Sequence, residues 1–152
     1  MNQKIDTYTQ HILSYYPNLS IETVTLNVEG QFNDVVMINA DTEDGLIFRF
    51  AKYAEAAATL QQETIILQHI QDYITLAIPN PIFNSDNSAP IGERFMGYRM
   101  ISGTTLWNEQ FQAITSPAKK DYLAVQIATF LRELHARVAA QRGTARSQHR
   151  LG

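Results

Sequence analysis

Residues 29–63 read EGQFNDVVMINADTEDGLIFRFAKYAEAAATLQQE, and most of the predicted architecture follows from this stretch. It contains two short apolar runs, 35–39 and 46–50, with Asp44-Gly45 between them. An Asp-Gly pair between two such runs is typical of a β-hairpin. We therefore predict that the two runs form paired antiparallel strands, with Arg49 inside the second strand.

A helix is predicted next, over residues 54–73. Its apolar residues recur at helical spacing, and Glu63 falls on the same stripe as Leu60 and Leu67. A carboxylate on a buried stripe is costly unless it meets a cation. Arg49 is the first candidate partner and Lys52 the second. The alternative is that Glu63 reaches the edge of the stripe and stays solvated, or bonds a glutamine or water.

The connection before the hairpin, residues 29–34, is short and contains Gly30. Such a connection can direct several backbone N–H groups at one anion, which makes phosphate binding a hypothesis here. The alternative is an ordinary polar turn. The chain has no Gly-Lys-Ser or Gly-Lys-Thr triplet and no G-x-G-x-x-G sequence, which excludes the P-loop and dinucleotide-binding motifs.

The other segments complete an α+β fold: a five-stranded antiparallel sheet with a packed helix, an N-terminal helix and a further helix late in the chain. With 152 residues, one core is expected. Apolar spacing predicts the first helix, alternation predicts the first strand, and Ser116-Pro117 is a helix-start signal. The predicted elements outside the hairpin and its helix are a helix at 4–16, strands at 19–28, 82–83 and 94–101, and a helix from 117.

The late helix carries a wide apolar face that the elements before it do not need. We interpret it as the first helix of a second layer whose remainder is missing from the chain. The residues on this face are Leu123, Ile127, Phe130, Leu131 and Leu134.

Composition narrows the class of protein. Apolar content of 45% fits a globular protein, and no run approaches the roughly 20 apolar residues of a membrane span. The first six residues lack an apolar leader, so a cytoplasmic protein is expected. The absence of cysteine excludes disulfides and cysteine-based zinc sites, and the four histidines show no ligand spacing.

The net charge of −3 divides into −7 over residues 1–136 and +4 over residues 137–152. The basic tail lacks apolar periodicity and is predicted to be disordered. Four arginines without interleaved aromatic residues are a weak signal for nucleic acid, so we do not expect nucleic-acid binding.

Four blocks, taken together and in order, resemble the aminoglycoside phosphotransferase family, which are small-molecule kinases with a protein-kinase-like fold. The resemblance covers about residues 1–136. It implies a nucleotide-binding N-terminal lobe at 1–103, a linker and the first helix of an incomplete C-terminal lobe at 104–136, and an unrelated tail at 137–152. The four blocks are EGQFND at 29–34, IFRFAKYAE at 47–55, FMGYRMISG at 95–103 and FLRELHA at 130–136.

The resemblance also implies roles for residues. Arg49 stands where the family has a third-strand lysine that contacts the α- and β-phosphates, and Glu63 stands where a helix carboxylate orients that lysine. Arginine keeps the charge but changes reach and geometry, and Lys52 is the fallback. Residues 99–101 resemble the hinge that bonds the base, and 30–34 the loop over the phosphates. The implied nucleotide-binding residues are Gly30, Gln31, Phe32, Asn33, Asp34, Arg49, Glu63, Arg99, Met100 and Ile101.

The family uses ATP or GTP with Mg, and its catalytic aspartate, metal-binding asparagine and second metal-binding aspartate lie downstream of the last block. Here the last aspartate is Asp121 and the last asparagine is Asn108. We therefore expect an N-terminal lobe, truncated or frameshifted near residue 136, that lacks catalysis. Its parent would transfer the γ-phosphate to a hydroxyl of a small molecule. The alternatives are a binding module that self-associates through the 120–136 helix, and a non-functional gene remnant.

Overall fold

A computed structural model describes the backbone of residues 3–148 and the side chains up to residue 136. The chain divides into two compact units. The first unit comprises residues 1–69 and 79–101, and the second comprises residues 70–78 and 102–152.

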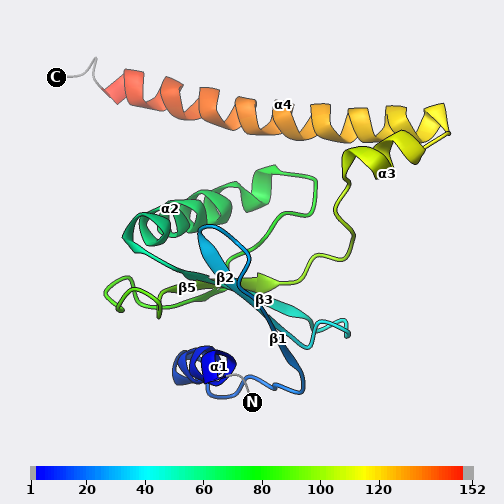
Figure 1. Cartoon of the computed structure of the whole chain (residues 1–152). Coiled ribbons are helices and arrows are strands. Elements are labelled where there is room, and N and C mark those ends of the chain that lie inside the picture. Colours follow the sequence, from blue (N-terminus) through cyan, green and yellow to red (C-terminus); the bar gives the residue numbers. More distant parts are fainter. Residues whose placement is uncertain (1–2, 149–152) are drawn as a thin grey trace. The chain divides into compact units, whose positions relative to one another are not determined.

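The first unit is built on a five-stranded antiparallel sheet with the order β1-β2-β3-β5-β4 (Figure 1). The predicted α+β class and the five strands are confirmed. The first strand is shorter than predicted, because it pairs with β2 over four residues only. The strands are β1 (Val24–Asn27), β2 (Asn33–Ile38), β3 (Leu46–Ala51), β4 (Phe83–Asn84) and β5 (Phe95–Arg99).

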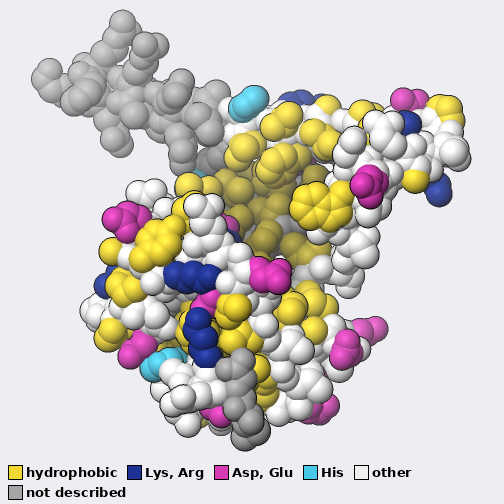
Figure 2. All heavy atoms as spheres, viewed as in Figure 1, with side chains coloured by type: hydrophobic (Ala, Val, Ile, Leu, Met, Phe, Trp, Pro, Cys, Tyr) yellow, Lys and Arg dark blue, Asp and Glu magenta, His cyan; other side chains and the backbone are white. Residues whose placement is uncertain are grey.

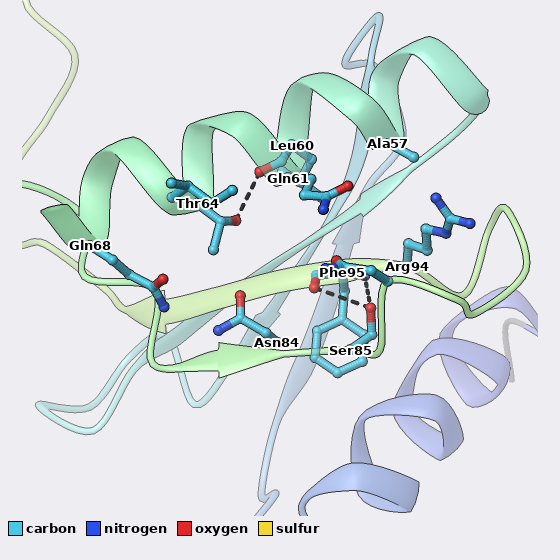
Figure 3. A pocket seen from close by; sticks show the side chains of 11 residues that line it. Ala57, Leu60, Gln61, Thr64, Gln68, Asn84, Ser85, Arg94 and Phe95 are labelled. Carbon is cyan, nitrogen blue, oxygen red and sulfur yellow. Dashed lines mark hydrogen bonds between the residues drawn. The ribbon is translucent and has the colours of Figure 1, made fainter. Parts of the chain in front are cut away.

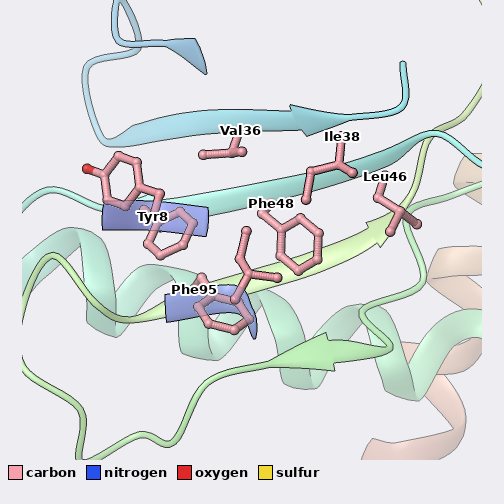
Figure 4. Close-up of a cluster of buried hydrophobic side chains, with 8 residues drawn as sticks. Tyr8, Val36, Ile38, Leu46, Phe48 and Phe95 are labelled. Atoms are coloured by element: carbon pink, nitrogen blue, oxygen red, sulfur yellow. The ribbon is translucent and has the colours of Figure 1, made fainter. Parts of the chain in front are cut away.

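Two helices, α1 (Gln3–Tyr15) and α2 (Ala54–Ile70), cover opposite faces of this sheet (Figure 1). Alternation along the strands supplies each helix with an apolar face. Figure 4 shows the larger cluster, on the α1 side. The α1-side cluster consists of Tyr8, Ile12, Val36, Ile38, Leu46, Phe48, Phe50 and Phe95. The α2-side cluster consists of Ala51, Ala56, Ala57, Leu60 and Met96.

The connection between β2 and β3 is longer than a two-residue Asp-Gly turn. The last strand pair is Ile38 with Leu46, so residues 39–45 form the loop. Asn39 adopts a φ of 51°, and its side-chain oxygen accepts the backbone N–H groups of Glu22 and Thr23 at 2.9 and 3.1 Å. The left-handed backbone of Asn39, rather than Asp44-Gly45 alone, therefore starts the reversal.

The second unit contains a 3₁₀ turn, η1 (Gln71–Tyr73), and the helices α3 (Asn108–Ala113) and α4 (Pro117–Gln148). The predicted start of α4 is confirmed: Ser116 precedes the helix, and its hydroxyl accepts the N–H of Lys119 at 3.4 Å. Helix α3 was not predicted from the sequence pattern. The backbone of 137–148 is helical where a disordered tail is predicted, whereas residues 149–152 lie outside the described residues.

Inside the second unit, the carboxylate of Glu133 on α4 accepts the backbone N–H of Thr75 at 2.9 Å and its hydroxyl at 2.5 Å. These bonds lower the pKa of Glu133. Figure 2 shows hydrophobic side chains along the described part of α4. None of the helices over residues 3–148 has the length and apolar character that crossing a membrane requires.

Candidate functional site

The centre of the candidate site is an ion pair between β3 and α2. Arg49 Nη1 lies 2.5 Å from Glu63 Oε1, and the two side chains are 23% and 35% exposed. Odd-numbered residues of β3 face α2, and the helical stripe through Leu60 places Glu63 on the inner side of the helix. The pairing predicted from sequence is confirmed, and Lys52 is not the partner of Glu63.

The surface around the pair is half-buried. Arg49 has Val35 on β2 and Met96 on β5 as its strand neighbours, so all three lie on the α2 face. The pKa of the neighbouring Tyr98 is raised by burial. The Arg49 charge lowers this pKa, and the Glu63 charge raises it. Arg49 is paired with one carboxylate, that of Glu63, and its side chain is still 23% exposed. The exposed part of the guanidinium can bind a second anion.

The connection between β1 and β2 lies at the adjacent end of β3. Asn33 pairs with Ala51, two residues along the strand from Arg49, which is roughly 7 Å. Gly30 has no room for a side chain, because a Cβ would come within 2.6 Å of the Asn33 carbonyl oxygen. Phe32 is 52% exposed at the tip, beside the ring of Tyr53 at 6.2 Å. The predicted loop residues 30–32 thus lie beyond this end of β3, where the N–H of Lys52 donates to the Phe32 carbonyl at 3.1 Å.

Asn33 and Asp34 belong to β2 rather than to the connection. Asp34 pairs with Phe50, and both face α1, whereas Arg49 faces α2. The Asp34 side chain is 1% exposed, so the structure places it on the opposite face of the sheet from the ion pair. Its assignment to the nucleotide site stays a prediction, and its contacts are with the protein.

The Asp34 carboxylate gathers three partners. Its Oδ2 accepts the Tyr8 hydroxyl at 2.6 Å and lies 2.6 Å from Lys4 Nζ, and its Oδ1 lies 3.1 Å from Lys52 Nζ. The Oδ1 contact is an ion pair without well-aligned hydrogen-bond geometry. Burial raises the pKa of Asp34, but the bonds from Lys4, Tyr8 and Lys52 outweigh it and hold the pKa below 3.8.

Sequence reasoning missed this network. One signal was available: Asp34 shares its strand parity with the buried Val36 and Ile38, which places its side chain toward the core. Nothing local indicates that Lys4 and Tyr8 on α1 lie over this part of β2.

The predicted hinge segment lies at the other end of β3, where Leu46 pairs with Arg99. The N–H of Met100 donates to the Gly45 carbonyl at 2.8 Å, so this amide bonds the β2–β3 loop. The Arg99 side chain is 66% exposed and lies 3.6 Å from Asp44. The predicted loop residues 30–32 and the predicted hinge residues 99–101 therefore lie at opposite ends of β3, and Arg49 lies between these ends.

A half-open cavity of about 270 Å³ lies beside α2, against the segment 84–95 (Figure 3). Some of its polar groups already bond the protein: the Thr64 hydroxyl donates to the Leu60 carbonyl at 2.8 Å, and Arg94 Nε donates to the Ala89 carbonyl at 2.6 Å. The residues that line it include none of the predicted site residues. The cavity is therefore separate from the candidate site.

The residues present fit a nucleotide better than a metal ion. Arg49 supplies a cation for phosphate. Over the described part of the chain, no three histidine, aspartate or glutamate side chains lie together as a metal site would need. The magnesium ligands that the resemblance implies are not among the described residues.

Comparison with known proteins gives a consistent result. The phosphotransferase enzyme family matches residues 23–152, beyond residue 136, where the sequence analysis places the end of the resemblance. The GDP and kanamycin complex of APH(2'')-IIIa matches with 30% identity and a TM-score of 0.72, over 84% of this chain and 41% of that one. The GDP complex of wild-type aminoglycoside 2'-phosphotransferase-IIIa matches with 30% identity and a TM-score of 0.73, over 87% of this chain and 42% of that one.

The gentamicin complex of APH(2'')-IIa shares the fold, with a TM-score of 0.69 at 22% identity over 90% of this chain and 40% of that one. No curated protein matches the chain. The chain spans about two fifths of the length of these solved structures, as the likeness to one lobe implies. On the family match over most of its length, the chain belongs to the phosphotransferase enzyme family.

Proposed function

We propose that the α2 face of the sheet binds the phosphates of ATP or GTP, and that the protein containing this lobe transfers the γ-phosphate to a hydroxyl of a small molecule. The observation that carries the proposal is the Arg49–Glu63 ion pair at 2.5 Å. A carboxylate that holds a guanidinium in one position prepares it for an incoming phosphate, because little side-chain freedom remains to be lost on binding.

The surroundings support this role. The β1–β2 connection, at the near end of β3, is closely packed at Gly30, where a side chain would clash with the Asn33 carbonyl oxygen, and the segment 99–101 lies at the far end. The two relatives at 30% identity are complexes with GDP, which makes a guanine nucleotide a candidate beside the ATP that the family resemblance implies. Kanamycin in one of them makes an aminoglycoside the first substrate class to test with the whole protein.

The test is calorimetric titration of the 152-residue chain with Mg-ATP and Mg-GTP. Arg49→Ala and Glu63→Ala are each expected to weaken binding roughly 10- to 100-fold, since a charge-assisted bond contributes roughly 1.5–3 kcal/mol. The double variant should be no weaker than either single variant, because the two side chains act as one unit.

Arg132→Ala is the matched control, since it removes an arginine from the exposed surface of α4. Its affinity for nucleotide should equal that of the original chain. Additive losses for Arg49 and Glu63, or an equal loss for Arg132→Ala, would contradict the proposed site.

A second candidate is a protein-interaction module. The described part of α4 exposes four large apolar side chains, Tyr122, Val125, Ile127 and Leu131, at 64%, 61%, 60% and 45%. Ile127 and Leu131 lie on the apolar face predicted from sequence, whereas Tyr122 and Val125 lie on the other side of the helix. Exposed apolar side chains on one face can mark an interaction site. On this alternative, two copies of the chain cover these residues for each other.

A further inference from the structure

We propose that Lys52 is a positioning residue that fixes the β1–β2 connection, residues 28–32, and is not a ligand of the phosphates. Lys52 follows the end of β3, and its ammonium group turns toward this connection. It donates to the carbonyl of Val28 at 2.7 Å and to the carbonyl of Gly30 at 2.6 Å. One side chain thereby joins two points of the connection that are two residues apart.

The backbone of Lys52 adds a third contact. Its N–H donates to the carbonyl of Phe32 at 3.1 Å. Carbonyls 28, 30 and 32 are therefore all held by one residue. Within the connection, the N–H of Glu29 also donates to the Asn27 side-chain oxygen at 2.8 Å, which fixes the same segment from its first strand.

The donor count argues against a phosphate role for this lysine. An ammonium group has three N–H donors, and two of them are used by the carbonyls of Val28 and Gly30. Its charge is matched by the Asp34 carboxylate at 3.1 Å. Lys52 therefore has at most one N–H left to offer a phosphate, and that donor lies beside the Asp34 carboxylate.

We call the three contacts of Lys52 with the carbonyls of Val28, Gly30 and Phe32 the clamp. The carboxylate next to its ammonium group, Asp34, lies on the α1 side of the sheet. Asp34 is 1% exposed and is itself fixed by the Tyr8 hydroxyl at 2.6 Å and by Lys4 at 2.6 Å. Helix α1 therefore holds the carboxylate that holds Lys52. The carboxylate sets the position of the ammonium group, whereas the bonds to the carbonyls of Val28 and Gly30 are what hold the connection itself.

The clamp itself needs no nucleotide, and only its effect on affinity rests on the proposed function. It is tested on the full chain without ligand by backbone ¹⁵N relaxation. In the original chain the order parameters of residues 29–32 are expected near 0.85, and in Lys52→Met they should fall below about 0.6. Residues of β3 and α1 should keep their values in both proteins.

Lys4→Met is the matched control. It also removes an ammonium group from Asp34, but it leaves the bonds from Lys52 to Val28 and Gly30, so the order of residues 29–32 should be unchanged. An equal loss of order in both variants would assign the effect to the charge at Asp34 and overturn the proposal. Unchanged order in Lys52→Met would overturn it as well.

Nucleotide titration of the same variants separates this inference from the proposed function. A loosened connection should weaken Mg-ATP binding by Lys52→Met several-fold. Reduced affinity with full loop order would make Lys52 a phosphate ligand and contradict the clamp. If the original chain binds no nucleotide, the proposed function fails, whereas the relaxation result still decides the clamp.

Discussion

At Gly97, in the middle of β5, a Cβ would lie 2.6 Å from Cδ1 of Phe48 and 3.1 Å from Cβ of Phe83. Phe48 is fully buried, so its ring has no room to move away. We expect Gly97→Ala to lower the free energy of unfolding by about 1–3 kcal/mol, as overpacking of cores does. Urea denaturation followed by circular dichroism measures this change.

A double variant distinguishes overpacking from a loss of strand backbone preference. Phe48→Leu removes the ring that the new methyl group would meet. Gly97→Ala should therefore be less harmful in the Phe48→Leu background than alone, with a coupling energy of about 1 kcal/mol. Strictly additive effects would mean that the contact with Phe48 is not the cause.

Asp34 makes the stability of the sheet depend on pH. Its folded pKa lies below the usual 3.8, so its ionised form is favoured by folding. The contribution of ionised Asp34 to the free energy of unfolding is therefore fully present above about pH 4 and is lost as the pH falls through the folded pKa. Asp34→Asn should lower the free energy of unfolding by about 2 kcal/mol at pH 7, because it removes charge-assisted bonds at a buried group.

Unfolding curves of both proteins from pH 7 to pH 2 check this prediction. The difference between the chain and its Asp34→Asn variant should shrink as the pH falls below 4. A difference that stays constant over this range would show that packing, and not the charge of Asp34, sets the loss.

At the scale of elements, the bonds from Thr75 to Glu133 join the segment after η1 to α4 inside the second unit. Glu133→Ala should remove the acceptor of the Thr75 amide. We expect that amide to exchange with deuterium about tenfold faster, as loss of one hydrogen bond predicts. Arg132→Ala, on the neighbouring position of α4, should leave the exchange unchanged, and equal acceleration in both variants would contradict the link.

Sequence patterns predicted elements well where periodicity was long. The helix expected at 4–16 spans residues 3–15, and the helix from residue 54 carries its apolar stripe inward as expected. Helix α3 was missed because its six residues are too few to show a period. The first strand was overestimated because alternation continues past the residues that find a partner on β2.

In the candidate site, too, some contacts could be predicted from sequence and others could not. Arg49 and Glu63 could be paired from sequence, since a strand position and a helical stripe fix which way each side chain points. The contacts of Asp34 could not be predicted, because they depend on α1 crossing the sheet near the start of β2. The partners of Lys52 could not be predicted for a similar reason. They are backbone carbonyls, which every residue has, so no residue type indicates them.

At the scale of the whole molecule, the apolar residues of α4 predict association between copies if nothing else covers them. Sedimentation equilibrium of the full chain should then show a dimer that dissociates on dilution. Ile127→Glu should weaken the dimer at least tenfold, because it places a charge in an apolar contact. Arg132→Glu, also exposed on α4, is the control, and a single monomeric species at every concentration would exclude the interaction module.

Because α1 lies at the start of the chain, it is synthesised well before some of the strands against which it packs. The Tyr16 hydroxyl bonds the backbone of Asn84, 68 residues later, and the ring of Tyr15 packs against Phe95 at 5.6 Å. A ribosome adding roughly 5–20 residues per second makes Asn84 roughly 3–14 s after Tyr16. During synthesis the apolar side of α1 must wait for strands that do not yet exist, so the lobe cannot complete its core until β5 has emerged. Its folding is therefore paced by translation and exposed to chaperones for that interval.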